Sequence, residues 1–167
     1  MLTSATSLRL LDFAQLKDVY EEGNRENGED LYPHLPAGQQ LLQAEQDFYD
    51  YLRTGFFTQP GDRYCIWVVD GIYVSALRLQ TYQDGLLLEA LETHPNYRGR
   101  GYAKALIRAV QETVESEKVY SHISRRNASS IAAHTACGFQ KILNHSVYAD
   151  GSVNSHCHTY RYEKPTP

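Results

Sequence analysis

Glycines and basic side chains alternate over residues 94–103, and this combination can hold a phosphate group. The segment reads HPNYRGRGYA and lies between an apolar run over 86–91 and a stretch whose apolar positions repeat with helical spacing. A helix therefore begins here, and its first backbone amides lack carbonyl partners and point outward with the positive end of the helix dipole. Gly99 and Gly101 keep side chains out of the path of an anion. Positive charge around the site comes from Arg98, Arg100 and Lys104.

The spacing of this segment excludes the two best-known nucleotide loops, since neither G-x-G-x-x-G nor G-x-x-x-x-G-K-[ST] occurs in it. The spacing Arg98-x-x-Gly101-x-Ala103 instead resembles the acyl-CoA diphosphate loop of the GNAT superfamily of N-acetyltransferases. For the segment taken alone, a helix start with glycines chosen only for turn geometry is the competing interpretation.

A second segment is similar to another signature of that superfamily, an Asn-led helix that ends in Gly-Phe. It runs from Asn127 to Phe139; Asn127 can cap a helix, and Gly138 can take the left-handed conformation that ends one. The two signatures occur in the family's order, within a resemblance that covers about 64–148. It implies an α/β fold of the α+β type, with a mixed, mostly antiparallel sheet of about seven strands flanked by about four helices.

The resemblance also implies direct transfer of an acetyl group from acetyl-CoA to an amine of a small molecule or peptide, in a ternary complex. The strand before the loop would bind the pantetheine arm through its backbone, and the loop would bind the diphosphate. The residues assigned to the cofactor in this way are Leu91, Thr93, Arg98, Gly99, Arg100, Gly101, Tyr102, Ala103, Lys104 and Asn127. No metal is expected, because the neighbours in His156-Cys157-His158 alternate faces of a strand and cannot all reach one ion.

Glu89 and Glu92 are the candidate general bases on the strand before the loop. Burial against an apolar wall raises the pKa of a carboxylate, which favours accepting a proton from an ammonium near neutral pH. Alternation puts the two on opposite faces, whereas a bulge, common in this strand of the family, brings both to one face. We prefer Glu89 because it lies deeper in the strand; a carboxylate held by a structural partner is the alternative.

The general acid is where this sequence departs from the family pattern. A tyrosine usually follows the signature asparagine by seven residues and can protonate the departing thiolate, but here that position is His134. An imidazole can donate a proton near neutral pH; a buried histidine without a catalytic role fits equally well. The departure keeps open a second function, a catalytically weak acyl-CoA-binding sensor or regulatory module with the same fold.

The remaining pattern predicts the elements that position these residues. Asp12 caps a first helix to about Tyr20, and a polar loop with Pro33 and Pro36 follows. A second helix is expected over 38–53. Strands are expected over 8–11, 64–69, 72–81, 86–93 and 119–123, and in a C-terminal hairpin of 141–148 with 153–163.

Length and composition set the broad class. The chain has 167 residues, 42% of them hydrophobic, which suits one domain over 1–167. No apolar run reaches the ~20 residues that span a bilayer, and the first residues do not resemble a signal peptide. Three scattered cysteines without a C-x-x-C pair suit a reducing compartment. We therefore expect a soluble cytoplasmic protein without a membrane partner.

Charge is distributed unevenly along the chain. Residues 1–60 carry four basic side chains against ten carboxylates, whereas the rest carry twelve against ten. The acidic part suits a cationic amine acceptor, and solvated surface is the alternative for each of its carboxylates. The densest acidic cluster is Glu21, Glu22, Glu26, Glu29 and Asp30. No basic stripe with interleaved aromatics indicates nucleic acid, and the sequence leaves monomer or homodimer open.

Overall fold

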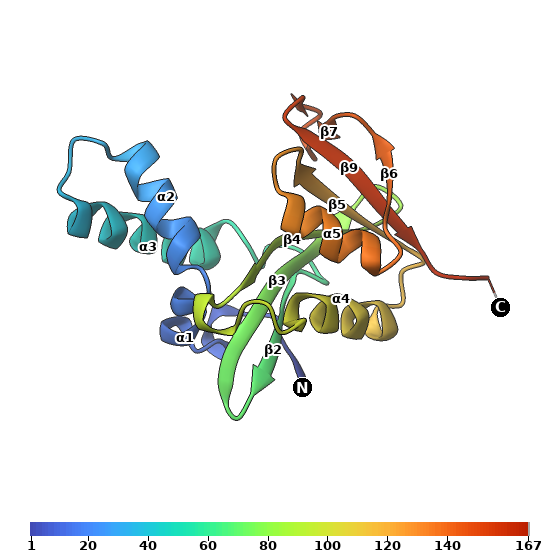
Figure 1. Cartoon of the computed structure of the whole chain (residues 1–167), viewed down its shortest axis with the longest axis horizontal. Coiled ribbons are helices and arrows are strands. Elements are labelled where there is room, and N and C mark those ends of the chain that lie inside the picture. The colour runs from blue at the N-terminus through green and yellow to red at the C-terminus, as the bar shows by residue number, and fades with distance from the viewer. Residues whose placement is uncertain (167) are drawn as a thin grey trace.

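Seven strands form one sheet in the computed structural model, which describes residues 1–166 (Figure 1). Their order is β1-β2-β3-β4-β5-β9-β6; β4 and β5 are parallel, and the other neighbouring pairs are antiparallel. This confirms the mixed, mostly antiparallel sheet expected from the sequence. The strands are β1 (Leu2–Ala5), β2 (Arg63–Val69), β3 (Ile72–Tyr82), β4 (Gly85–Thr93), β5 (Lys118–Ser124), β6 (Gln140–Leu143) and β9 (Cys157–Glu163). A separate small sheet pairs β7 (Ser146–Val147) with β8 (Val153–Asn154).

Over the described residues five α-helices accompany the sheet, and two of them begin at the caps that the sequence predicts. The helices are α1 (Phe13–Val19), α2 (Glu21–Leu31), α3 (Ala37–Thr54), α4 (Tyr102–Thr113) and α5 (Ala128–Ala136). Asp12 accepts a hydrogen bond from the Gln15 amide ahead of α1, and Asn127 accepts one from the Ser130 amide ahead of α5. Gly138, with a φ of +85°, takes the left-handed conformation after α5. Within residues 1–166, no helix combines the length and apolar character needed to cross a membrane.

Two expectations for the N-terminal part are wrong. Residues 8–11 are not the first strand, because Leu8–Leu10 is a short 3₁₀ helix and the edge strand is β1. Four residues are too few for periodicity to separate a strand from a helical turn. The polar segment after α1 is not a loop either, since α2 occupies most of it.

A close contact between α2 and α3 explains why the sequence pattern missed α2. The two helices lie side by side and extend away from the sheet (Figure 1). A Cβ on Gly28 would lie 2.5 Å from the Gln40 carbonyl oxygen, so glycine is needed for this approach. The buried residues of α2 are Asn24 and Gly28, neither of which is large and apolar. Periodicity finds a helix by its apolar face, and α2 has almost none.

The predicted C-terminal hairpin is present in two parts. Its tip is the β7–β8 pair, and its base is formed by β6 and β9 within the main sheet. The Thr159 hydroxyl donates a hydrogen bond to the His145 carbonyl oxygen (2.7 Å), which ties β9 to the chain between β6 and β7.

Both faces of the central strands are buried, each beneath different helices. The α4 face holds Leu77, Leu88, Leu106, Ile107 and Phe139, and the face beneath α1 and α3 holds Leu16, Leu52, Tyr64, Ile66 and Ala76. Full burial of one such aliphatic or aromatic side chain contributes roughly 1.5–3 kcal/mol. The strands that carry the predicted site are therefore held from both sides.

A β-bulge in β4 brings the two candidate bases to one face of the sheet. Arg78 of β3 pairs with Glu89, and Ala76 pairs with Glu92, so two steps along β3 correspond to three along β4. Ala90 lies within the bulge at a φ of +52°. The bulge expected from the family resemblance is thus present, and Glu89 and Glu92 point in the same direction.

Beyond the bulge, β4 separates from its parallel neighbour. The pairing of β4 with β5 covers only Leu86–Leu88 on β4. The Tyr20 hydroxyl, from the junction of α1 and α2, donates a hydrogen bond to the Ala90 carbonyl oxygen (2.5 Å) and holds the bulge against the helices. The end of β4 therefore pairs with β3 but not with β5, and it leads into the glycine loop.

Candidate active site

The glycine loop ends at the N-terminus of α4 with its amides uncovered. Gly99 and Gly101 have φ values of +74° and +81°, a conformation that L side chains rarely adopt. Gly101 caps α4 without a side-chain hydrogen bond, so the first-turn amides keep their donors for another partner. A Cβ at either glycine would meet nothing within 4 Å, which means that the space in front of the loop is open. Such a cradle fits a diphosphate.

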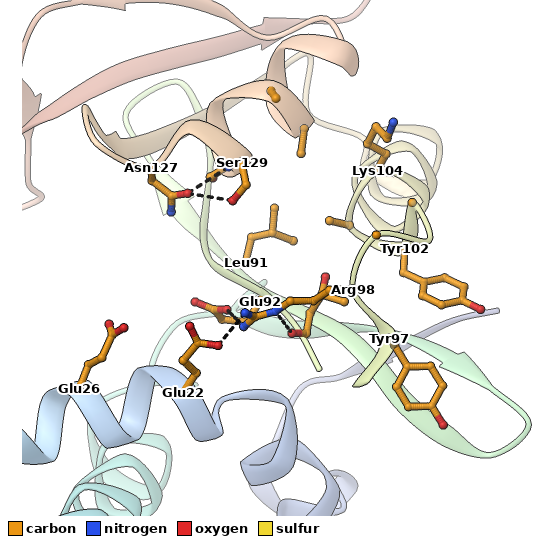
Figure 2. A pocket seen from close by; sticks show the side chains of 17 residues that line it. Glu22, Glu26, Leu91, Glu92, Tyr97, Arg98, Tyr102, Lys104, Asn127 and Ser129 are labelled. Atoms are coloured by element: carbon orange, nitrogen blue, oxygen red, sulfur yellow. Dashed lines mark hydrogen bonds and ion pairs between the residues drawn. The ribbon is translucent and has the colours of Figure 1, made fainter. Parts of the chain in front are cut away.

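A cavity of about 590 Å³, which we call the loop cavity, lies in front of this helix start (Figure 2). Every residue that the sequence assigned to the cofactor lines it except Arg100, whose guanidinium lies 5.3 Å from the centre of the Tyr97 ring. Figure 2 shows Asn127, the cap of α5, and Ser129 of α5 across the hollow from Lys104 of α4. The lining residues are Glu22, Glu26, Leu91, Glu92, Thr93, Tyr97, Arg98, Gly99, Gly101, Tyr102, Ala103, Lys104, Asn127, Ser129, Ser130, Ala132 and Ala133.

Several of these lining residues were missed by sequence reasoning. Ser129, Ser130 and Ala133 lie on α5. Ser130 follows the predicted Asn127 by three residues, and Ala133 follows Ser130 by three and Ser129 by four, a helical spacing that was a usable signal. Glu22 and Glu26 belong to the predicted acidic cluster, but their presence in the cavity depends on α2, which the sequence pattern did not reveal.

Arg98 connects the loop to the acidic groups of α2 and β4. Its guanidinium lies 2.6 Å from the Glu22 carboxylate and 3.9 Å from the Glu92 carboxylate. Its Nε donates a hydrogen bond to the Thr93 carbonyl oxygen (3.3 Å). Figure 2 shows this side chain between β4 and α2, at the floor of the loop cavity.

A second cavity of about 470 Å³, the α2–α3 cavity, lies between these two helices and the sheet. Its walls are aromatic on the helix side and carry carboxylates. It is lined by Tyr20, Gly23, Asn24, Glu26, Asn27, Leu31, Ala44, Asp47, Phe48, Tyr51, Tyr64, Arg78, Ala90 and Glu92. Glu26 and Glu92 line both cavities, so the two hollows meet at these carboxylates.

Glu92 and Glu89 have different surroundings although they share a face. Burial raises the pKa of Glu92, the positive charge of Arg98 lowers it, and the negative charges of Glu22 and Glu26 raise it further. Burial also raises the pKa of Glu89, while Arg78, 3.4 Å away, lowers it. Glu89 lines neither cavity, whereas Glu92 lines both.

His134 faces the core rather than the cavities. It is 1% exposed, and its ring packs edge-on against Phe139, with centroids 5.0 Å apart. Its Nδ1 lies 2.8 Å from the Ser130 carbonyl oxygen, which can only accept, so Nδ1 carries the proton. Nε2 is buried and has no hydrogen-bond partner among residues 1–166, and burial lowers the pKa of the ring. The geometry favours the structural interpretation of His134, and its predicted acid role stays a prediction.

No group of three His, Cys, Asp or Glu side chains within residues 1–166 is arranged to hold a metal ion. The side chains that the two cavities share are the carboxylates of Glu26 and Glu92.

A sequence model described as the acetyltransferase (GNAT) family matches residues 17–139. The PaiA N-acetyltransferase of Thermoplasma acidophilum, solved in complex with coenzyme A, is 12% identical over 98% of this chain and 99% of its own, with a TM-score of 0.66. The ribosomal-protein-S18-alanine N-acetyltransferase of Escherichia coli is 16% identical over 98% and 94%, with a TM-score of 0.61.

A third solved structure, of aminoglycoside 6'-acetyltransferase type Ii, is 13% identical over 100% of this chain and 99% of its own, with a TM-score of 0.62. At these identities the structures bear on the fold alone, and they confirm it. Among curated protein sequences, none matches this chain.

Proposed function

The chain belongs to the acetyltransferase (GNAT) family, and from that premise we propose that it transfers an acetyl group from acetyl-CoA directly to an amine while both substrates are bound. The observation that carries the proposal is that the loop cavity and the α2–α3 cavity meet at Glu92 and Glu26. One reactant can enter from each side. Holding two reactants in this way is worth up to about 7–11 kcal/mol in well-aligned systems.

The loop cavity suits acetyl-CoA. The first-turn amides of α4 and the side chain of Lys104 would hold the diphosphate, with Gly99 and Gly101 giving the backbone close access. Leu91 and Thr93, at the end of β4, would position the pantetheine arm, and Asn127 and Ser129 would close the opposite wall. The thioester would then lie near the bulge.

Glu92 is the side chain that we propose as general base, in place of the preference for Glu89. Glu92 borders both cavities, and burial raises its pKa toward the range in which it can take a proton from an ammonium. Glu89 is held by Arg78 instead, which is the structural alternative that the sequence left open.

No side chain is needed in our proposal to protonate the departing thiolate. A thiol has an ordinary pKa of about 8.5, so a thiolate leaves readily near neutral pH and can take its proton from solvent. His134 is not used, because the N–H of its neutral ring, at Nδ1, donates a hydrogen bond to the Ser130 carbonyl oxygen in the core.

The test mixes the protein with acetyl-CoA and a panel of amines, and follows free CoA by a thiol reagent. We expect at least one amine to cause release well above the rate without acceptor, and mass spectrometry to find the acetylated amine. CoA binding, measured by calorimetry, should occur without any acceptor.

If departure of the thiolate does require a side-chain acid, the buried position of His134 favours one other function, the acyl-CoA-binding module without catalysis. That function predicts CoA binding with no acceptor-dependent release for the whole panel. Absence of CoA binding would contradict both functions.

A further inference from the structure

An unpaired side-chain amide in the α2–α3 cavity indicates which class of acceptor this cavity can bind. Asn24 lines this cavity and is 6% exposed, and its Nδ2 is buried without a hydrogen-bond partner in the part of the chain described, 1–166. A buried donor without a partner is destabilising, and such groups are rare in folded proteins. Asn24 follows Tyr20 by four residues, so both lie on one face of the α2 segment, and Tyr20 reaches the bulge beside Glu92.

Arg78 adds a second donor group to the same cavity. It lies on β3 opposite Glu89 and is held there through Nε at 3.4 Å. Its guanidinium lies 4.9 Å from the centre of the Tyr51 ring, a position that orients it without using its hydrogens. In sheets, diagonal neighbours lie roughly 7–8 Å apart, so Arg78 and Glu92, on the same face, can contact one small molecule together.

We infer that the acceptor is an α-aminoacyl group, whose amine faces Glu92 and Glu26 and whose carbonyl or carboxylate oxygen is bound by Asn24 and Arg78. This inference rests on the proposed function and names the acceptor's class. The cavity offers carboxylates for an ammonium, and for an oxygen it offers the Arg78 guanidinium and the Asn24 amide, whose Nδ2 is unpaired within residues 1–166. An α-aminoacyl group carries both functions on adjacent carbons. The aromatic wall of Phe48, Tyr51 and Tyr64 leaves room for an apolar side chain.

A linear diamine fits this cavity less well, although it would satisfy the carboxylates. A protonated diamine has only donors, so it would leave Asn24 Nδ2 unpaired and would bring a second positive charge near Arg78. The negative charge of the cavity favours a cation of either class, and the donors of Asn24 and Arg78 favour the α-aminoacyl group over the diamine.

The experiment compares acceptors that differ in one function. Alaninamide, free alanine and the peptide Ala-Ala-Ala carry the α-aminoacyl group, isopropylamine has the same branched carbon next to nitrogen without the oxygen, and 1,4-diaminobutane is the diamine. Binding of each to the complex of the protein with CoA is measured by calorimetry, and acetylation from acetyl-CoA is measured separately. We expect the preferred α-aminoacyl compound to exceed isopropylamine at least about tenfold, both in affinity and in the rate of acetylation.

Two variants test the role of Asn24 itself. In N24L the preference for alaninamide over isopropylamine should fall to within about twofold, since the donor is gone. N24D keeps the size of the side chain and replaces the donor with an acceptor, so it should shift preference toward 1,4-diaminobutane. The matched control is Gln39→Leu, an exposed amide on α3 outside both cavities, which should leave the preference as it is.

The three α-aminoacyl compounds distinguish the source of the acceptor. A free amino acid presents a carboxylate, so the double variant R78M/E89Q should weaken the binding of alanine more than the binding of alaninamide. A peptide N-terminus presents a neutral carbonyl, and Ala-Ala-Ala would then bind at least as well as alaninamide.

Equal or better binding of isopropylamine or 1,4-diaminobutane would overturn the inference. An equal loss of affinity for every acceptor in N24L would also overturn it, because that indicates a structural role for Asn24. The absence of binding by every amine would overturn it as well. Selective binding of the α-aminoacyl compounds without any acetylation would instead support the inference and contradict the proposed function.

Discussion

The Arg98 guanidinium and the Glu22 carboxylate, 2.6 Å apart, tie the glycine loop to α2 across the floor of the loop cavity. The two side chains are 43% and 52% exposed, so water and salt screen their attraction, and such a pair contributes about 0–1 kcal/mol. Arg98 also belongs to the positive charge available to a diphosphate. If the loop binds the diphosphate as we propose, Glu22 competes with the cofactor for this guanidinium.

Replacing Glu22 with glutamine should release Arg98 and strengthen CoA binding. One kcal/mol corresponds to about fivefold in Kd, so we expect a two- to fivefold gain at low salt and a smaller gain at high salt. Calorimetric titration with CoA at two salt concentrations measures it. Glu29→Gln makes the same charge change on α2 outside both cavities and is the control; weaker binding by E22Q would contradict the competition.

The E92Q and E89Q variants should separate the two carboxylates of β4. E92Q removes the proposed base, so kcat should fall about a hundredfold or more with little change in CoA affinity. In the unchanged protein, kcat should rise with pH as Glu92 loses its proton, with a midpoint above the ordinary Glu value because burial raises the pKa. The pH profile of E92Q should lack this rise.

E89Q should act on stability instead. It leaves Arg78 buried without its carboxylate partner, and breaking a buried pair costs about 3–5 kcal/mol, somewhat less here because Glu89 retains some exposure. Thermal unfolding and kcat of the two variants are measured side by side. If E89Q abolishes turnover while Tm stays unchanged, Glu89 is the base after all.

These contrasts also show how far the sequence could predict the site. The glycine loop, the Asn127 cap and the candidate carboxylates could be found because each depends on neighbours in the sequence. The choice between Glu89 and Glu92 could not, because it depends on cross-strand partners, Arg78 for one and the cavities for the other. The α2–α3 cavity was equally out of reach, since α2 lacks an apolar stripe and is held by the contact at Gly28.

Two glycines with nearly the same left-handed backbone conformation test the phosphate cradle. Gly101 has a φ of +81° at the cavity, and Gly151, in the turn between β7 and β8, has a φ of +84° away from it. Alanine at either position should destabilise the fold by about 1–2 kcal/mol, because a Cβ is unfavourable in the left-handed conformation. Only G101A places a methyl group where the diphosphate would lie. We expect its Kd for CoA to rise at least about tenfold, with G151A unchanged; equal affinities would move the diphosphate away from this loop.

His134 should make stability depend on pH. Burial lowers the pKa of the folded-state ring below the ordinary His value near 6.5, so the unfolded chain binds the proton more readily. The contribution of neutral His134 to the free energy of unfolding is therefore fully present above pH 6.5. It is lost as the pH drops from there through the folded-state pKa, by up to about 1.4 kcal/mol per pH unit. Urea unfolding at several pH values measures this slope. His122, whose pKa is also lowered by burial, contributes in the same direction.

The H134L variant should lose part of this slope while keeping its turnover. Leucine removes both the titrating ring and its buried Nε2, and His156→Gln, at an exposed histidine, is the matched control. Turnover is compared at pH 8, where the unchanged protein holds His134 neutral, and is expressed per folded molecule from the unfolding curve. Because Nδ1 is bonded to Ser130 in the core, we expect H134L to stay within about threefold of the unchanged protein. A loss of tenfold or more with intact CoA binding would restore the acid role that the position of His134 in the sequence suggests.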